Sequence, residues 1–432
     1  MTTASVNSVP ETSEPAPPES AAAKIRIHRR LLPLYVSSWV LGITLWAPVE
    51  KLFLKHIGFT AATVGLLAAT YAAIVPFLEI PSGILADRWS RRGVLMISNA
   101  ALGASELVGG LSTNVPMYLI SALLLGVYFA LHSGTVDSIV YDVLLEETGT
   151  SDGFERFLGR VQVGESAALV VSALAGAAIA QLWSPRATYF LTIPFVIVSI
   201  IVVGRLREPQ LHRAEESAPL RHQVATTYRT FIDARQLRPI IVSLVLTGVL
   251  LQMLVEFGPF WMVALGAPAV LFGPQWASLM SALGLGGLVA GRIPQCGKSL
   301  IAVVLAMITS GFVLVSSANA IAVIGAQVVL AVLLVATSTV AMRQLHDHVP
   351  SSHRAGVSSG VGTLTWMGFL PVSLVFGLLT QKVGIHTSAL MILGLIVLTS
   401  AALLRMARRE GITTGVRCSD HNVVVGLRIR EL

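Results

Sequence analysis

Long apolar runs separated by short charged connections dominate the hydrophobic pattern of the chain. Each run is long enough to cross the roughly 30 Å hydrocarbon core of a bilayer as a helix. The pattern predicts twelve membrane-spanning helices, at residues 31–50, 61–84, 93–112, 115–137, 161–183, 187–204, 239–262, 274–291, 299–317, 319–341, 356–379 and 384–405. The one long connection, at residues 206–238, divides the spans into two sets of six. We therefore predict an all-α integral membrane protein made of two six-helix halves.

The same pattern sets the predicted domain boundaries. They are a disordered N-terminal tail at 1–30, a first bundle at 31–205, a linker at 206–238, a second bundle at 239–405 and a tail at 406–432. The first residues are rich in Pro, Ser, Thr, Glu and Ala and lack an apolar run, which is typical of disorder. In the linker, Val224, Tyr228, Phe231 and Ile232 recur at helical spacing among basic residues. The linker is therefore either an amphipathic surface helix or a plain flexible segment.

The charged residues predict the orientation in the membrane. With both termini on one side, all but four of the 30 Lys and Arg residues fall on that side, the exceptions being Lys51, Lys55, Arg186 and Lys382. Because basic residues mark cytoplasmic connections, both termini and the linker are predicted to be cytoplasmic, in the cell membrane. A hydrophobic content of 54% and a charged content of 12% argue against a soluble enzyme. The net charge of +7 does not indicate a nucleic-acid partner, because the basic residues lie between apolar runs.

The most specific motif lies between the second and third spans. It reads Gly83-Ile84-Leu85-Ala86-Asp87-Arg88-Trp89-Ser90-Arg91-Arg92. This stretch resembles the signature loop of the major facilitator superfamily of secondary transporters, with Ser90 where a second glycine is usual. Acids at the end of the fourth span and Arg354-Ala355 at the start of the eleventh extend the resemblance, which covers the chain from about Arg30 to Arg405.

The resemblance implies the superfamily fold, with parallel repeats and transport by alternating access. It also implies a cytoplasmic gate, in which Asp142 pairs with arginines of the motif and Asp87 meets the amino end of the eleventh helix near Arg354. The gating residues predicted in this way are Gly83, Asp87, Arg88, Arg91, Arg92, Asp142 and Arg354. Drug/proton antiporters of the superfamily usually carry an arginine in the fourth span and a Gly-Pro pair in the fifth, and this chain has neither.

A possible duplication links the first span of each half. Gly42, Trp46 and Glu50 correspond in spacing to Gly248, Gln252 and Glu256. The i, i+4, i+8 spacing predicts that each set lies on one helical face.

Aromatic and polar residues inside the spans are the candidates for substrate binding. The resemblance places spans one, four, seven and ten around a central cavity. Tyr128 shares a face of the fourth span with His132, Gln252 shares one of the seventh with Glu256, and Trp39 shares one of the first with Trp46 at i, i+7. Trp366 lies near mid-membrane in the eleventh. Such a pocket suits an amphipathic or aromatic organic solute better than a sugar.

Energy coupling is predicted to come from a gradient, because the chain contains no G-x-x-x-x-G-K-[ST] phosphate loop. The candidate proton carriers are Glu256, whose apolar neighbours disfavour a bare charge, and His132, whose ring titrates near neutral pH in water. Cys296 and Cys418 lack metal-ligand spacing, so we expect no metal and no cofactor.

These features together predict a function. We expect a monomeric secondary transporter, not an enzyme, that exports a small, fairly apolar organic molecule using the proton gradient. Uptake of a metabolite is the alternative within transport. A non-transporting receptor or a membrane enzyme is the alternative from another class.

Overall fold

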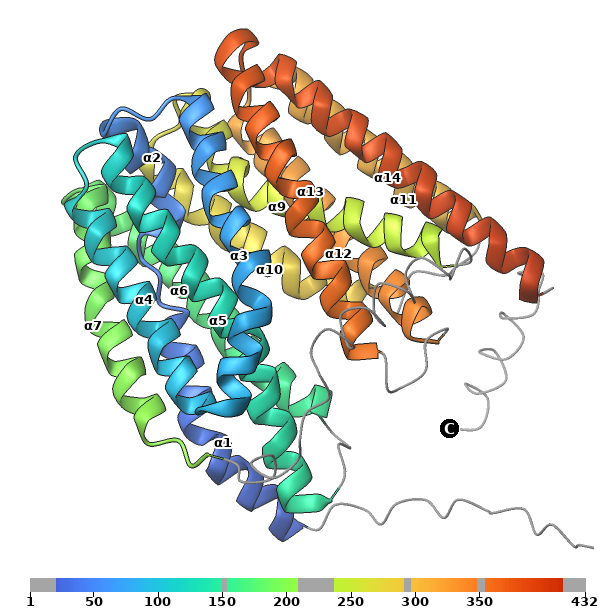
Figure 1. The fold of residues 1–432 in the computed structure, drawn as a ribbon. Helices are drawn as coiled ribbons and strands as arrows, with labels where there is room; N and C mark the ends of the chain where they lie inside the picture. The colour runs from blue at the N-terminus through green and yellow to red at the C-terminus, as the bar shows by residue number, and fades with distance from the viewer. Residues whose placement is uncertain (1–20, 150–153, 209–236, 291–296, 348–353, 415–432) are drawn as a thin grey trace, which may run out of the picture.

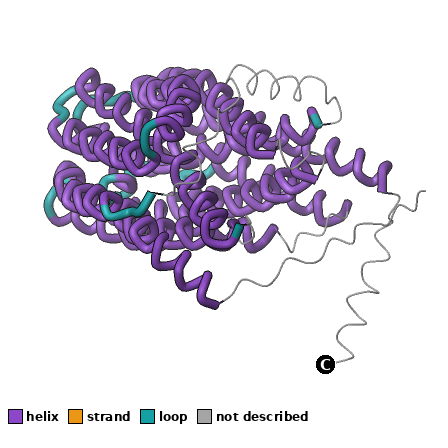
Figure 2. The backbone as a smooth tube through the Cα atoms, turned by 60° about the horizontal axis from the view of Figure 1, so that its bottom comes forward, coloured by secondary structure: helices purple, strands orange, loops and turns teal. Residues whose placement is uncertain are grey.

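The computed structural model describes residues 21–149, 154–208, 237–290, 297–347 and 354–414. Within these ranges the chain is helical and contains no strand (Figure 2). The side chains of residues 79–88 and 354–356 lie outside the described part. Most of the predicted linker, with its amphipathic segment, and residues 1–20 and 415–432 also lie outside it.

Twelve long helices make up the described ranges (Figure 1). They are α1 (Ala21–Leu41), α3 (Ala61–Arg88), α4 (Arg91–Leu111), α5 (Val115–Thr148), α6 (Phe154–Leu182), α7 (Pro185–Gly204), α9 (Arg238–Ala264), α10 (Phe272–Ala290), α11 (Gly297–Ser316), α12 (Ala320–Asp347), α13 (Arg354–Val383) and α14 (Ile385–Thr414). Three short elements join them: η1 (Ala47–Val49), α2 (Glu50–His56) and η2 (Ala269–Leu271). Ten of the twelve long helices are apolar and long enough to cross a membrane. The other two long helices are α1 and α10. The predicted all-α, twelve-helix fold is confirmed.

The helices form two bundles that meet along two seams. In the first bundle α4 packs on α5 and α7, and α1 packs on α6 and α7, while in the second α12 packs on α9 and α10, and α14 on α9 and α11. Between the bundles, α3 packs on α13 and α6 packs on α10. We call the end of the molecule that carries α2 and the turn between α13 and α14 the α2 end. The opposite end, where α1 begins, is the α1 end, and toward it the ribbons of the two bundles spread apart in Figure 1.

The first span is broken, which corrects the prediction of one helix at 31–50. The α-helix ends at Leu41, an irregular segment follows, and η1 and α2 resume the path. A proline in a helix lacks an N–H donor and its ring collides with the carbonyl four residues earlier, so Pro48 prevents helical continuity through Thr44. Neighbouring helices hold the break. The N–H of Leu45 donates to Oγ1 of Thr192 at 3.2 Å, and a Cβ on Gly176 would collide with the Leu45 carbonyl oxygen.

Both predicted tails are shorter than expected. Helix α1 begins at Ala21, so residues 21–30 belong to the bundle, and helix α14 continues to Thr414. In the N-terminal segment Ile27 is fully buried and packs in the core with Leu144 and Val203. Apolar burial of this kind outweighs the polar composition of the surrounding tail.

Ser90 in the motif between α3 and α4 caps the second of these helices. Its backbone is extended, with φ −172°, and its side-chain oxygen accepts from the N–H of Gly93 at 2.9 Å. Because this conformation needs no positive φ, serine fits the position where a glycine is usual, and it supplies a helix cap that glycine cannot make.

The bundles approach most closely at the α2 end. A Cβ on Gly65 of α3 would lie 2.6 Å from the carbonyl oxygen of Ser373, and one on Gly377 of α13 would lie 2.7 Å from that of Ala61. On the other seam, a Cβ on Gly273 of α10 would lie 2.8 Å from the carbonyl oxygen of Ala173. Glycine is required at these positions because any larger residue would separate the helix backbones. This end of the molecule is therefore closed.

Candidate functional site

A buried ion pair joins the two bundles at the α2 end. Lys51, on α2, is only 3% exposed. Its Nζ lies 2.5 Å from Oε1 of Glu256, on α9 of the other bundle, and 2.6 Å from Oε2 of its neighbour Glu50. Helix α2 exists because the first span is broken, and its first turn places both charged residues over α9. Lys51, predicted to lie in the connection that follows the first span, is thus buried at the interface of the two bundles.

Tyrosines complete the shell around the two carboxylates. The hydroxyl of Tyr71, on α3, donates to Oε2 of Glu256 at 2.6 Å, and that of Tyr118, on α5, donates to Oε1 of Glu50 at 2.8 Å. Since each phenol has one proton, the hydroxyl of Tyr189, 2.7 Å from that of Tyr118, is the donor in that pair. Every oxygen of both carboxylates therefore has a partner, as buried charges require.

The charges of this cluster do not cancel. Two carboxylates share one ammonium group, so the cluster formed by Glu50, Lys51 and Glu256 carries one excess negative charge when both acids are ionised. Each of the three side chains is at least five-sixths buried. Removing charges from water costs several kcal/mol per ion unless they are fully paired. The arrangement is therefore suited to taking up a positive charge, the smallest of which is a proton.

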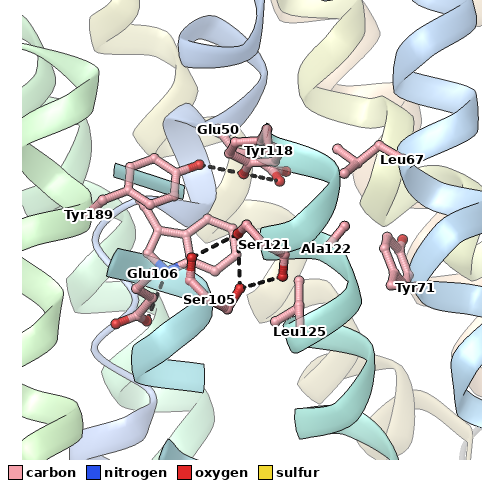
Figure 3. Close-up of a pocket in the computed structure, with 11 residues that line it drawn as sticks. Glu50, Leu67, Tyr71, Ser105, Glu106, Tyr118, Ser121, Ala122, Leu125 and Tyr189 are labelled. Atoms are coloured by element: carbon pink, nitrogen blue, oxygen red, sulfur yellow. Dashed lines mark hydrogen bonds between the residues drawn. The ribbon is translucent and has the colours of Figure 1, made fainter. Parts of the chain in front are cut away.

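A small cavity adjoins the cluster inside the first bundle (Figure 3). Its volume of about 10 Å³ leaves room for roughly one water molecule. The lining residues are Trp46, Glu50, Leu67, Tyr71, Ser105, Glu106, Tyr118, Ser121, Ala122, Leu125 and Tyr189. Figure 3 shows Tyr189 pointing toward Tyr118 and Glu50, with Tyr71 and Glu106 on opposite sides. Trp46, in the broken part of the first span, stacks on Tyr189 with ring centroids 5.4 Å apart.

An aromatic cluster lies beside the charged cluster, where the bundles meet. Trp366 and Phe369 of α13 lie 6.1 Å and 6.4 Å from the ring of Tyr71, and Phe129 of α5 lies 6.4 Å from Trp366. Phe129 is 38% exposed, whereas Phe369 is fully buried. Residues of α3, α5 and α13 thus share one apolar, ring-rich surface whose polar boundary is the Tyr71 hydroxyl on Glu256.

The predicted binding residues do not all lie together. Tyr128 and His132 share a face of α5 as expected, with ring centroids 4.9 Å apart, and Trp366 reaches this helix through Phe129. Nδ1 of His132 is buried and has no hydrogen-bond partner among the described residues. Gln252 is half-buried on α9, one turn from Glu256.

Two interpretations of the first span are wrong. Because α1 ends at Leu41, Trp39 and Trp46 do not share a helical face, and neither do Gly42, Trp46 and Glu50. Trp39 is 49% exposed, whereas Trp46 turns inward onto Tyr189. The corresponding set that includes Glu256 does lie in one continuous helix, α9.

The predicted gate at the α1 end is described only in part. The Arg91 guanidinium pairs with Asp142, which is 4% exposed, and also donates to the carbonyl of Ser138 at 2.9 Å. The Arg92 guanidinium reaches the carbonyl of Leu206. These contacts join α4 to α5 and to the end of α7. The other predicted gate residues, Gly83, Asp87, Arg88 and Arg354, lie in helices whose side chains there are outside the described part, and their gating roles stay predictions.

Sequence reasoning missed most of the residues around Glu256. Lys51, Tyr71, Glu106, Tyr118 and Tyr189 were not candidates. One signal was available in the sequence: Pro48 inside a predicted span, followed directly by Glu50-Lys51, indicates a helix break with charges behind it. The tyrosines carried no such signal, since single aromatic residues are common in spans.

The fold and this site define an integral membrane transporter of two helical bundles with charged groups at their interface. The sequence profile of the Major Facilitator Superfamily matches residues 32–367. The chain belongs to this superfamily, and it is therefore a multi-pass membrane transporter and not an enzyme. A solved structure of a variant of the nucleoside transporter NupG shares the fold, with a TM-score of 0.73 at 12% identity, over 88% of this chain and 99% of that one.

Similarity to curated relatives is limited to parts of the chain. A protein named Probable nitrate transporter NarT, from Staphylococcus aureus (strain Newman), is 23% identical over 130 residues, which are 29% of this chain and 33% of the relative. Multidrug resistance protein 2 from Bacillus subtilis (strain 168) is 27% identical over 168 residues, 39% of this chain and 41% of the relative. The chain thus spans less than half the length of either relative.

Proposed function

We propose that this transporter exports a small, fairly apolar organic molecule in exchange for protons, with Glu256 as the proton carrier. The observation that carries the proposal is the ion pair of Glu256 with Lys51, which crosses between the bundles in a buried site. In alternating access the two bundles rock about a central site, so a contact that crosses between them must break when that side opens.

Separation at the α2 end would leave the charges unequally paired. Lys51 moves with Glu50, because both belong to α2, and the two neutralise each other. Glu256 moves with α9 and loses its ammonium partner. A carboxylate without a counter-ion among apolar neighbours favours its protonated form. Glu256 would therefore take up a proton when the α2 end is open and release it when Lys51 returns.

This cycle has a direction. In the closed arrangement at the α2 end, the proton displaced by Lys51 can leave only toward the α1 end. The distribution of Lys and Arg predicts that the α1 end is cytoplasmic, with both chain termini there, in the cell membrane. Protons would then move inward, down the usual gradient, and could drive a substrate outward. His132 is the weaker candidate for this role, because it lies within one bundle and its Nδ1 lacks a described acceptor.

The substrate class is inferred from the aromatic cluster and the charges beside it. The rings of Tyr71, Phe129 and Trp366 offer stacking surfaces to an aromatic or apolar molecule. The excess negative charge of the adjacent cluster disfavours an anion, since Lys51 is already bonded to two carboxylates. These two features support drug export, which the name Multidrug resistance protein 2 states for that relative. Uptake of nitrate, which the name of the other relative states, remains the alternative.

Proteoliposomes provide the test, with ethidium and nitrate as the two probes. We expect ethidium movement driven by an imposed pH difference, ethidium-linked proton movement without one, and no nitrate flux. Glu256→Gln and Lys51→Met should lose proton-linked movement, whereas His132→Ala should keep it. Lys55→Met is the matched control, because Lys55 lies on the same short helix and is exposed. If Glu256→Gln retains both gradient-driven accumulation and ethidium-linked proton movement, Glu256 is not the carrier.

A further inference from the structure

Glu106 is a buried acid that the proposed cycle does not use. It lies on α4, lines the small cavity and is only 1% exposed. The indole N–H of Trp46 donates to its Oε1 at 3.1 Å. Its Oε2 is buried and has no hydrogen-bond partner among the described residues. Among the described residues, the carboxyl group of Glu106 thus has one hydrogen-bond partner, and that partner is neutral.

The surroundings of Glu106 do not compensate a negative charge. The cavity is lined by uncharged hydroxyl, indole and apolar groups, and by a second acid. The titratable groups around Glu106 include Glu50 on α2, Tyr71 on α3, Tyr118 and Tyr128 on α5, and Tyr189 on α7. Two cations on these elements are already bonded: Lys51 to Glu50 and Glu256, and Arg186 to the carbonyl oxygens of Gly110 and Ser112 at 3.1 Å and 2.9 Å.

An ionised carboxylate in such a place is costly, whereas a neutral carboxylic acid leaves at most one polar hydrogen unsatisfied. The single bond from Trp46 fits a neutral acid, because its carbonyl oxygen accepts one N–H and its hydroxyl side is the oxygen without an acceptor. The contrast with Glu256 is direct. There, each oxygen has a donor and one donor is a cation, which is the shell of an ionised group.

We propose that Glu106 is a second proton-binding residue, protonated in this conformation and deprotonated when the α2 end opens. Trp46 belongs to the broken part of the first span, directly before α2, so the segment that carries Lys51 also carries the only described donor to Glu106. Opening that displaces α2 would move Trp46 and admit water to the cavity, which stabilises the ionised acid. The proton then passes to that water at the α2 end, and Glu106 takes one up again from the same side as this end closes, so its exchange alone carries no proton across the membrane.

The two acids would therefore titrate in opposite senses during one cycle. Glu256 gains a proton when α2 moves away, and Glu106 loses one. This inference rests on the proposed proton coupling, but it concerns a different residue and has a direct readout. A protonated carboxyl has an infrared C=O absorption that a carboxylate lacks, and a hydrogen bond to its carbonyl oxygen lowers the frequency of that band.

Infrared difference spectra of the protein in liposomes, recorded between alkaline and neutral buffer, test the assignment. We expect a protonated-carboxyl band that disappears in Glu106→Gln, persists in Glu256→Gln and shifts to higher frequency in Trp46→Phe. The Trp46→Phe measurement keeps the native acid, so it remains informative if Glu106→Gln folds poorly. Gly65→Val, whose side chain would press on the Ser373 carbonyl only while the α2 end is closed, should weaken the band. Protons counted per ethidium in Glu106→Gln should match the parent.

The outcomes separate this inference from the proposed function. If the band is unchanged in both Glu106→Gln and Trp46→Phe, Glu106 is not protonated and the inference is overturned, whatever Glu256→Gln does. If the band behaves as expected in Glu106→Gln and Trp46→Phe but is as strong in Gly65→Val as in the parent, Glu106 is a static neutral acid and takes no part in the cycle. If Glu256→Gln alone transports normally, the proposed carrier is wrong, and the Glu106 band still decides the second site.

Discussion

The two ends of the molecule use charged residues differently. At the α2 end, the pair of Lys51 with Glu256 joins one bundle to the other. At the α1 end, the ion pairs of Arg91 with Asp142 and of Arg30 with Glu146 connect helices of the first bundle to each other. A pair within a bundle moves as a rigid unit, whereas a pair between bundles must break in the transport cycle. Only an ion pair within one bundle can therefore serve stability alone.

The difference extends to the backbones. At the α2 end, glycines on α3, α10 and α13 let the bundles touch, while toward the α1 end the ribbons diverge (Figure 1). The conformation is thus held by contacts at one end. Substitutions at the α2 end should therefore change both stability and conformation, whereas substitutions at the α1 end should change stability alone.

Removal of the cation between the bundles should have the largest effect. Lys51→Met leaves Glu50 and Glu256 as neighbouring buried acids, which should destabilise the closed arrangement by about 3–5 kcal/mol. Unfolding in mixed micelles and a double-mutant cycle with Glu256→Gln measure the loss and the coupling. The exchanged pair, Lys51→Glu with Glu256→Lys, keeps the total charge and should restore part of the stability. No coupling between the two positions would contradict the ion pair.

Loss of the buried ion pair of Arg91 with Asp142, at the α1 end, should have the second-largest effect on stability. Arg91→Gln removes a cationic partner of Asp142, an acid that is 4% exposed, and should cost about 1.5–3 kcal/mol. Since the pair lies within one bundle, exchange of amide hydrogens at the α2 end should not change. Arg92→Gln is the control, because the described contact of Arg92 is a longer bond to a backbone carbonyl. Faster exchange in α2 of Arg91→Gln would mean that the ends are not independent.

A larger residue in place of Gly65, where α3 meets α13, should shift the balance between the closed and open arrangements of the α2 end. Gly65→Val places carbon atoms against the Ser373 carbonyl, and the strain of about 1–3 kcal/mol applies only while the α2 end is closed. The population should therefore shift toward opening at that end, seen as faster hydrogen exchange in α2 and the start of α3. In Gly394→Val, whose side chain would meet open space, exchange there should match the parent. Equal exchange in both variants would show that the seam does not hold the closed state.

The smallest effect is expected at an exposed pair of the α1 end. Arg26 is 56% exposed where it meets Glu147. Solvent and salt screen such pairs, so Arg26→Gln should change the free energy of unfolding by about 0.2–1 kcal/mol, and less at high salt. Unfolding in low and high salt measures this. A loss as large as that of Arg91→Gln would contradict the role assigned to burial.

Much of the fold could be predicted from the chain itself, and less of the site. Helix positions followed from apolar runs, because each bilayer-spanning helix must be long and apolar in its own local sequence. Glu256 could be selected as a candidate for the same reason, since an acid inside a span is unusual anywhere. Its partners could not be selected, because Lys51 and Tyr71 meet it from elements of the other bundle.

The sequence by itself determined the class of protein, the number of long helices and the motif between α3 and α4, since all three depend on residues close together in the chain. Pro48 is a local signal for a break in the first span, but only the tertiary structure decided where the helix ends and that Trp46 and Trp39 face different ways. It also decided which charges share one buried site. Those features depend on the packing of α2 against α9, and of α6 and α7 against the irregular part of the first span. Contacts between residues far apart in the chain leave no periodic pattern in the sequence of any one helix.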